Sequence, residues 1–354
     1  MQVLAPLDAL RRDAMAAVLA RPRLGAILTR RDARLVVLAV VGIALALATS
    51  CALPAAALVL APVVLGVPHV ASDVRYLVLR RGLGRAAVVM AAAGCAAMLA
   101  LRVAEGLSDD ASAFAGFEIA LGATWVYAAV LVAGAASRAW GRALAVLGVV
   151  GVLAWVALRD PERARVVLAH GHNLVGVGLW VLFFRRARRP LVPVAVALAV
   201  ALAIAVTGAP LRIAHALGTD AALGMTVDDA AAMLAPGLTG SLAAGLVASY
   251  VLLQSVHYAV WLGWIPQDDV RGEGTLTFGM TARGFLRDFR PIGVVAVALG
   301  SLAVVLGALV SARGARDTYL TLASFHAYLE LAMLGYFVVA GLNARASSDT
   351  RAAT

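Results

Sequence analysis

The chain contains no lysine and has few charged or aromatic residues. Of its 354 residues, 14% are charged and 6% are aromatic, whereas 62% are hydrophobic, and the mean hydropathy is +0.91. Average soluble proteins carry roughly a quarter charged residues. The scarcity of charge therefore excludes a soluble globular enzyme, a disordered chain and a fibrous protein, and it predicts a membrane protein.

Cysteine is also scarce. The two cysteines, Cys51 and Cys95, fall in apolar segments without a CxxC or Cys/His spacing, so we expect neither a disulfide nor a cysteine metal site. All 30 basic residues are arginine, and the formal net charge is +10. The arginines form short clusters between apolar runs, without the basic stripe and interleaved aromatics of a nucleic-acid surface. No nucleic-acid partner is therefore expected.

Long apolar runs organise the whole chain. A membrane-spanning helix needs about 20 mostly apolar residues. Ten runs have this character, and they lie at about 35–52, 54–76, 84–104, 112–136, 141–158, 164–184, 191–209, 239–264, 291–311 and 318–342. The sequence predicts an all-α fold, a polytopic integral membrane helix bundle of about ten transmembrane helices.

The arginine clusters predict the topology and the domains. If the N-terminus is cytoplasmic, most arginines fall in cytoplasmic connections, as the positive-inside rule requires. Both termini are then cytoplasmic, and the long loop at 210–238 is outside. We expect three parts: a basic amphipathic segment at 1–34, a single transmembrane bundle at 35–342 and a cytoplasmic tail at 343–354. The expected location is a bacterial inner membrane, with membrane lipids as partners.

Ionisable residues inside the predicted spans are the strongest functional signal, because such groups are costly in a bilayer. Three acids lie inside spans: Asp73, Glu118 and Glu330. Five of the six histidines do so too: His69, His170, His172, His257 and His326. The sixth, His215, lies in the predicted outer loop, where a solvated residue is expected. For Glu118 three roles stay open: a ligand, a base near the ligands, or a residue nearer the membrane surface.

The spacing of these residues favours a metal site. His69 and Asp73 are four residues apart, as are His326 and Glu330, so each pair shares one helix face. Imidazole nitrogen together with carboxylate oxygen suits iron, manganese or zinc.

We expect His69, His257 and His326 to bind the metal, with either His170 or His172 as a fourth ligand. In a regular helix the latter two point about 200° apart. Asp73 and Glu330 are then expected to act in catalysis, by orienting ligands or by taking protons.

A family resemblance begins at Gly-Val-Pro-His-Val-Ala-Ser-Asp, residues 66–73. This segment resembles the Gly-x-Pro-His-x-x-x-Asp motif of the Brp/Blh family, the bacterial and archaeal membrane β-carotene 15,15′-dioxygenases. Later histidine motifs follow in a similar order, at 170–173, 255–258 and 325–330. The resemblance implies non-haem Fe2+ held by histidines within the membrane. It also implies O2 as a co-substrate and a hydrophobic substrate, with carotenoid cleavage to retinal as the activity.

Two other functions stay open. One is a haem-binding or quinol-linked electron-transfer protein, in which paired histidines are axial ligands. The other is a proton-coupled transporter with a His/Asp/Glu relay. The carboxylates four residues from the histidines argue against haem, and the absence of a visible internal repeat argues against the transporter.

Overall fold

The computed structural model describes residues 4–20, 25, 30–108, 113–184, 188–269 and 277–342. Within these residues, nine helices are long and apolar enough to cross a membrane. The described strands are two residues each, Ala221–Ala222 (β1) and Met225–Thr226 (β2), and they form one antiparallel pair. The protein is therefore an all-α, polytopic helix bundle, as its hydropathy predicted. The tail expected at 343–354 lies outside the described residues.

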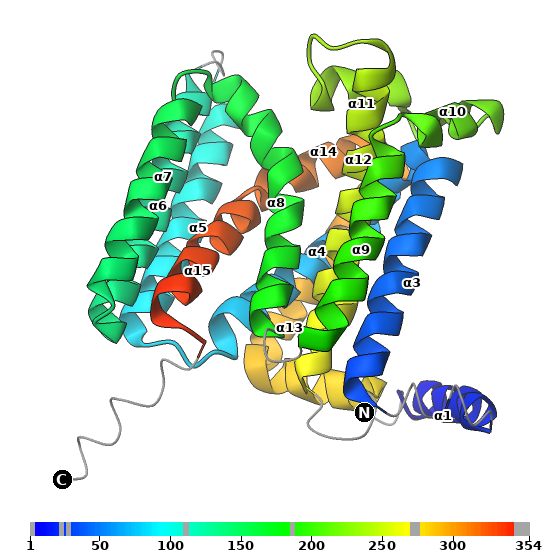
Figure 1. Ribbon diagram of the computed structural model, residues 1–354, viewed down its shortest axis with the longest axis horizontal. Coiled ribbons are helices and arrows are strands. Elements are labelled where there is room, and N and C mark those ends of the chain that lie inside the picture. Colours follow the sequence, from blue (N-terminus) through cyan, green and yellow to red (C-terminus); the bar gives the residue numbers. More distant parts are fainter. Residues whose placement is uncertain are drawn as a thin grey trace. The chain divides into compact units, whose positions relative to one another are not determined.

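The helices follow one another with short connections (Figure 1). Their bounds, in chain order, are α1 (Ala5–Leu19), α3 (Arg31–Ala52), α4 (Pro54–Val74), η2 (Arg75–Leu79), α5 (Arg85–Gly106), α6 (Phe114–Ser137), α7 (Trp140–Ala157), α8 (Pro161–Phe183), α9 (Arg188–Ala205), α10 (Ala209–Ala216), α11 (Val227–Leu234), α12 (Gly240–Ala259), η3 (Val260–Trp264), η4 (Ile265–Asp269), α13 (Phe278–Val310), α14 (Ala312–Ala323) and α15 (Phe325–Ala340).

The apolar run at 191–209, which was expected to form one membrane-spanning helix, instead forms a bent pair of helices. There α9 is followed by the short helix α10, and the two are bent by 62°. Gly208 has φ +68° at the bend, a left-handed conformation that glycine adopts without strain. Counting this bent pair as one span brings the described total to ten.

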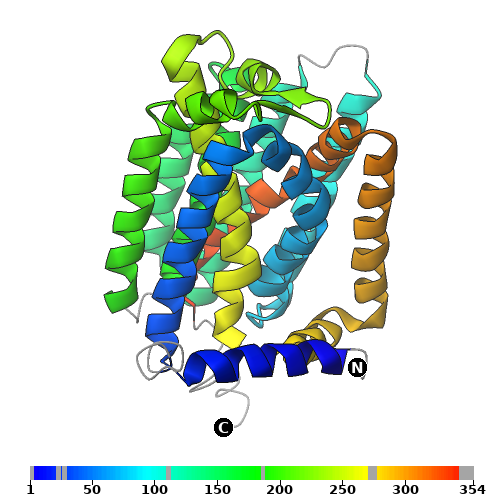
Figure 2. The same ribbon diagram turned by 90° about the vertical axis from the view of Figure 1, so that its right-hand side faces the viewer.

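The chain divides into two compact units, and the first comprises Met1–His69 and Trp180–Leu306. Helices α3, α9 and α12 pack against one another in this unit (Figure 1). Helix α1 lies across the end of α3 (Figure 2), where Asp8 accepts hydrogen bonds from the backbone N–H groups of Phe278 and Gly279 at 2.8 and 3.0 Å. A carboxylate at the start of α13 stabilises that helix end.

The second unit comprises Val70–Leu179 and Gly307–Thr354. Helix α6 contacts α5, α7 and α15 there. Glycines allow the close approach: a Cβ built at Gly122 would lie 2.1 Å from the Tyr328 ring, and one at Gly94 would lie 1.9 Å from Trp125. Small residues at such contacts are the usual way in which membrane helices pack without a hydrophobic driving force between them.

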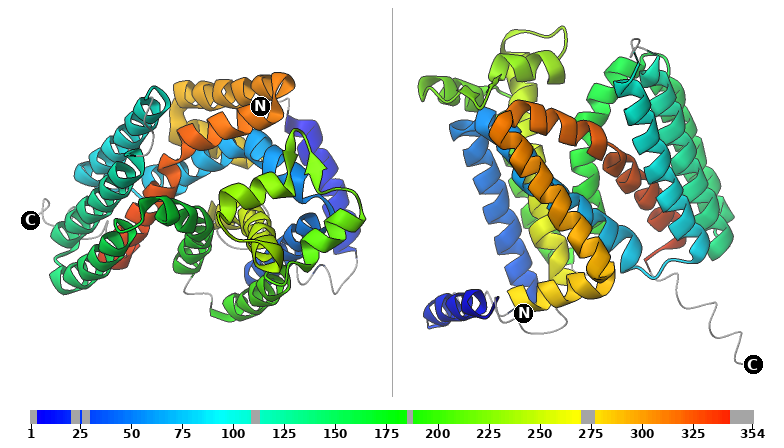
Figure 3. Two further views of the ribbon diagram at one scale, coloured as in Figure 1. Left: turned by 90° about the horizontal axis from the view of Figure 1, so that it is seen from above. Right: turned by 180° about the vertical axis from the view of Figure 1, so that it is seen from behind.

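Three helices lose regular geometry at defined positions. Helix α4 passes into the π-helical turn η2 directly after Asp73 and Val74, and α12 passes into the π-helical turn η3, which begins three residues after His257. Helix α13 kinks where Arg290, with φ 58°, precedes Pro291 (Figure 3). Proline explains the kink. The π-turns are of a kind that often occurs at functional sites, and they direct attention to Asp73 and His257.

Candidate metal centre

Helix α4 supplies His69 from a segment interrupted by Pro62 and Pro68. The His69 side chain is 2% exposed. Its Nδ1 donates a hydrogen bond to the Gly66 carbonyl oxygen at 2.8 Å. With the proton on Nδ1, the lone pair available to a metal is on Nε2.

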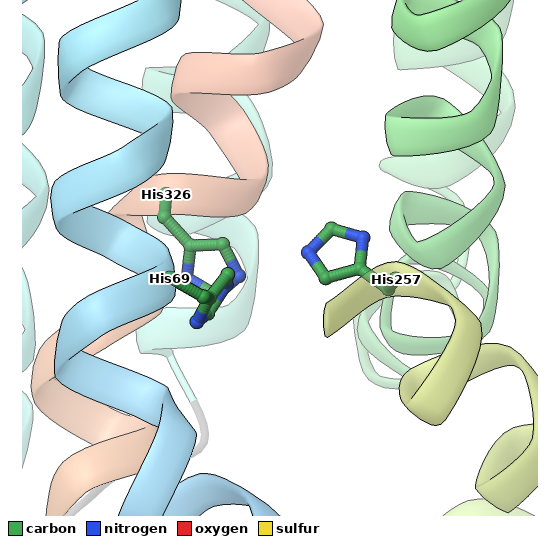
Figure 4. Close-up of side chains that lie close together, drawn as sticks. All are labelled: His69, His257 and His326. Carbon is green, nitrogen blue, oxygen red and sulfur yellow. The ribbon is translucent and has the colours of Figure 1, made fainter. Parts of the chain in front are cut away.

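Helix α12 brings His257 to His69 within the first unit. The two imidazole rings are in T-shaped contact, with centroids 5.2 Å apart, and the neighbouring Tyr258 ring is 4.8 Å from His69. Figure 4 shows the His257 ring extending from its helix toward His69. Because His257 is 1% exposed, water does not solvate either imidazole, and the pair forms a buried polar site in an apolar helix bundle.

His326 is the third histidine drawn in Figure 4. It lies in the first turn of α15, which Ser324 precedes, and its Nδ1 donates to the Ala323 carbonyl three residues earlier. This is the same local arrangement as at His69. His69 and His257 belong to the first unit and His326 to the second, so their grouping in one metal site stays a prediction from the sequence.

Helix α8 places His172 against another histidine ring. His172 lies in T-shaped contact with His326 in the second unit, with ring centroids 5.3 Å apart. Helix α8 is continuous across Gly171, so His170 points about 200° away from His172. His172 also donates from Nδ1 to the Leu168 carbonyl at 3.3 Å. Of the two proposed fourth ligands, His172 therefore lies nearer to His326.

The two carboxylates singled out by their spacing are both fully buried. Asp73 and Glu330 have no exposed surface, and within the second unit they are close enough for their charges to repel. Two neighbouring buried carboxylates cannot both stay ionised unless a cation balances them, and otherwise they share a proton. The pair is therefore stable only with a shared proton or with balancing positive charge, which the protein or a bound cation can supply.

Glu118 belongs to a different cluster. Its carboxylate forms ion pairs with Arg102 at 2.6 Å and with Arg165 at 2.5 Å, and it accepts a hydrogen bond from the Tyr328 hydroxyl at 3.1 Å. Glu105 bonds to the same two arginines at 2.5 and 2.9 Å. Both Glu118 oxygens are thus engaged by arginine, which makes Glu118 a structural anion and not a ligand.

Sequence reasoning missed this ion-pair cluster of Arg102, Glu105, Glu118 and Arg165. The charges of Arg102 and Glu105 lie near the end of one predicted span, and Arg165 lies near the start of another. Such residues are typical of membrane interfaces, so nothing in the pattern indicated convergence. The one available signal was the i, i+3 spacing of Arg102 and Glu105.

His215 is exposed, as expected, and it lies outside the nine candidate spans. Its Nδ1 donates to Asp220 at 2.7 Å. This hydrogen bond raises the pKa of His215 above its ordinary value and lowers the pKa of Asp220. The pair ties the end of α10 to the loop before β1 and has no link to the buried histidines.

Comparison of the chain with family models, with curated proteins and with solved structures finds no match. The assignment of function therefore rests on the residues themselves.

Proposed function

We propose that this protein is an integral membrane enzyme in which His69, His257 and His326 hold a non-haem iron and oxidise a lipid-soluble substrate with O2. The observation that carries the proposal is the shared anchoring of His69 and His326. Each donates its Nδ1 proton to the backbone carbonyl three residues earlier, so each presents Nε2. Metal-binding histidines almost always donate their other ring N–H to a carbonyl or carboxylate in this way.

The donor set fits a metal. Each of the three histidines offers a buried ring nitrogen, and such nitrogens bind metals at about 2.1 Å. Neutral imidazoles suit iron, copper, zinc or nickel, and the choice of iron comes from the resemblance to the Brp/Blh family.

Asp73 and Glu330 fit two roles in such a site. A dication near them would be stabilised by both carboxylates, which attract positive charge in a buried segment. Each shares a helix face with a histidine four residues away, so each can also hold or pass a proton next to that imidazole. We assign them to orienting the ligands and to proton transfer.

Iron held by histidines, with open coordination positions, supplies the activation of O2 that an oxygenase needs. The surrounding residues exclude water, because the three histidines are at most 6% exposed. The remaining parts of the proposal, a carotenoid substrate cleaved to retinal and a bacterial inner membrane, rest on the motif at residues 66–73 and on the arginine pattern.

A haem held between the two rings of a contacting pair is disfavoured by geometry. The paired rings, His69 with His257 and His172 with His326, are in direct T-shaped contact. Axial ligands lie on opposite faces of a porphyrin, and rings in contact leave no room for one between them. A proton relay is the second candidate, because the adjacent Asp73 and Glu330 could share a proton without any metal.

Metal analysis of detergent-purified protein tests the proposal. Wild-type protein should contain iron, and His257→Ala should lose most of it while eluting as the same species. His215→Ala is the matched control, because it removes a histidine outside the group and should keep full metal content. A triple alanine variant of His69, His257 and His326 that keeps its metal would overturn the proposal.

Variants of Asp73 and Glu330 distinguish a metal enzyme from a proton relay. Asp73→Asn and Glu330→Gln keep shape but remove charge, so we expect lower iron occupancy and slower O2 consumption with β-carotene, together with loss of retinal formation. In a relay, wild-type protein would contain no metal, and the same variants would abolish proton-coupled transport in proteoliposomes.

A further inference from the structure

The second unit contains a cavity of about 750 Å3 between α6, α7, α8 and α15. Its walls are formed almost entirely by aliphatic side chains, including Val126, Val150, Leu168 and Leu331. Ligand pockets are typically about 300–1,000 Å3, mostly apolar, with a few placed polar groups. The cavity has the size and lining of a site for a sizeable apolar molecule.

One polar group in the lining links the cavity to the candidate metal centre. His172 lines the cavity, and its ring is in contact with that of His326. No other histidine is found among the lining residues, all of which the structure describes. A molecule in the cavity would therefore lie against a histidine that touches one of the proposed ligands.

The charges of the lining cancel. Asp160 and Arg163, at the connection between α7 and α8, form an ion pair at 3.1 Å. No other Asp, Glu or Arg belongs to the described lining. A phosphate group needs a cation that is not already balanced, so the lining favours an uncharged molecule over a phospholipid.

The rim faces apolar surroundings. Leu153, Val156 and Val167 line the cavity and are 63%, 55% and 69% exposed. Helix α7, which carries two of them, has little of its surface buried by protein. In a membrane these side chains contact lipid, so a lipid-soluble molecule can enter sideways between the helices without crossing water.

We propose that this cavity binds an uncharged lipid, with its apolar part along α7 and α8 and against His172. The role of this molecule as substrate rests on the function proposed above. The binding of this molecule does not rest on that function, because the cavity, its lining and its charge balance do not depend on a metal.

Gly171 offers a sharp test. It lines the cavity, and a Cβ added there meets no atom within 4 Å. Gly171→Leu should therefore begin its side chain in free space and occupy part of the cavity, and leucine favours a helix over glycine. Gly178 is the matched control: it lies on the same helix, is equally open to a Cβ, and is not among the lining residues.

The probe is a long-chain fatty alcohol with a photoreactive diazirine, added to purified wild-type protein with and without bound metal. We expect labelling of the α7 and α8 peptides in both states. In Gly171→Leu it should be weaker by about tenfold, because losing two buried methylenes costs about that factor in affinity. Gly178→Leu should label like wild type.

Ala154→Leu narrows the cavity from α7 and keeps the test valid if Gly171→Leu misfolds. Equal labelling of wild type, Gly171→Leu and Ala154→Leu would overturn the proposal, and so would stronger labelling of the cavity by a photoreactive phosphatidylcholine. A wild type that labels as expected but binds no iron would refute the proposed function and leave this inference standing.

Discussion

Replacing Glu118 by Gln should strongly destabilise the protein. Glu118 is the central carboxylate of the ion-pair cluster, its side chain is 3% exposed, and it contacts both Arg102 and Arg165. The amide keeps the shape but changes the cluster of two arginines and two glutamates from neutral to a net positive charge. Leaving one buried charge uncompensated costs about 3–5 kcal/mol. We expect the lower end, about 3 kcal/mol, because the arginines are 13% and 20% exposed and Glu105 remains.

Glu162→Gln is the matched control, because Glu162 contacts the same arginine. Its oxygen lies 3.9 Å from Arg165, and its side chain is 64% exposed, so the loss should stay below about 1 kcal/mol. The free energy of unfolding can be measured by SDS titration in mixed micelles, followed by circular dichroism. Equal losses for Glu118→Gln and Glu162→Gln would show that the cluster is solvated and would refute the reasoning.

Three further predictions concern other parts of the chain. Gly122→Ala puts a Cβ 2.1 Å from the Tyr328 ring, so the same titration should show a loss of about 1–3 kcal/mol from overpacking; an unchanged midpoint would contradict the packing. The pKa of His215, followed by NMR, should lie above its ordinary value and fall when Asp220 is changed to Asn, because the hydrogen bond that favours the protonated ring is lost; an unchanged titration would disprove the pairing. A cysteine introduced at Asp228 should react with an impermeant maleimide in intact cells, and one in the C-terminal tail only after permeabilisation; the reverse pattern would invert the topology.

The fold was predictable from the sequence because a bilayer demands long apolar helices. Hydropathy located the spans, and the exception at 191–209 arose where Gly208 turns the chain after α9. The hydropathy of α9 and α10 together is that of one span, and composition does not encode the bend. The π-helical turns after Asp73 and His257 were equally invisible, since they depend on packing and not on residue type.

The candidate site was predictable in part. The i, i+4 rule placed His326 and Glu330 on one face from the sequence alone, because that relation is local. Which histidine of α8 lies against His326 was not predictable, since this depends on how α8 is rotated about its own axis. The convergence of Arg102 and Arg165 on Glu118 needs three helices to meet, and no local pattern specifies it.

Helix α15 shows how the ion-pair cluster and the candidate metal centre are connected. His326 and Glu330 share one face of this helix, and Tyr328, two residues from each, points about 200° away from both. The opposite face is held in place: the Tyr328 ring lies against Gly122 of α6, and its hydroxyl donates to Glu118. Glu118 is in turn fixed by Arg102 of α5 and Arg165 of α8. The cluster therefore sets the rotation of α15 from behind, and this rotation determines where His326 and Glu330 point.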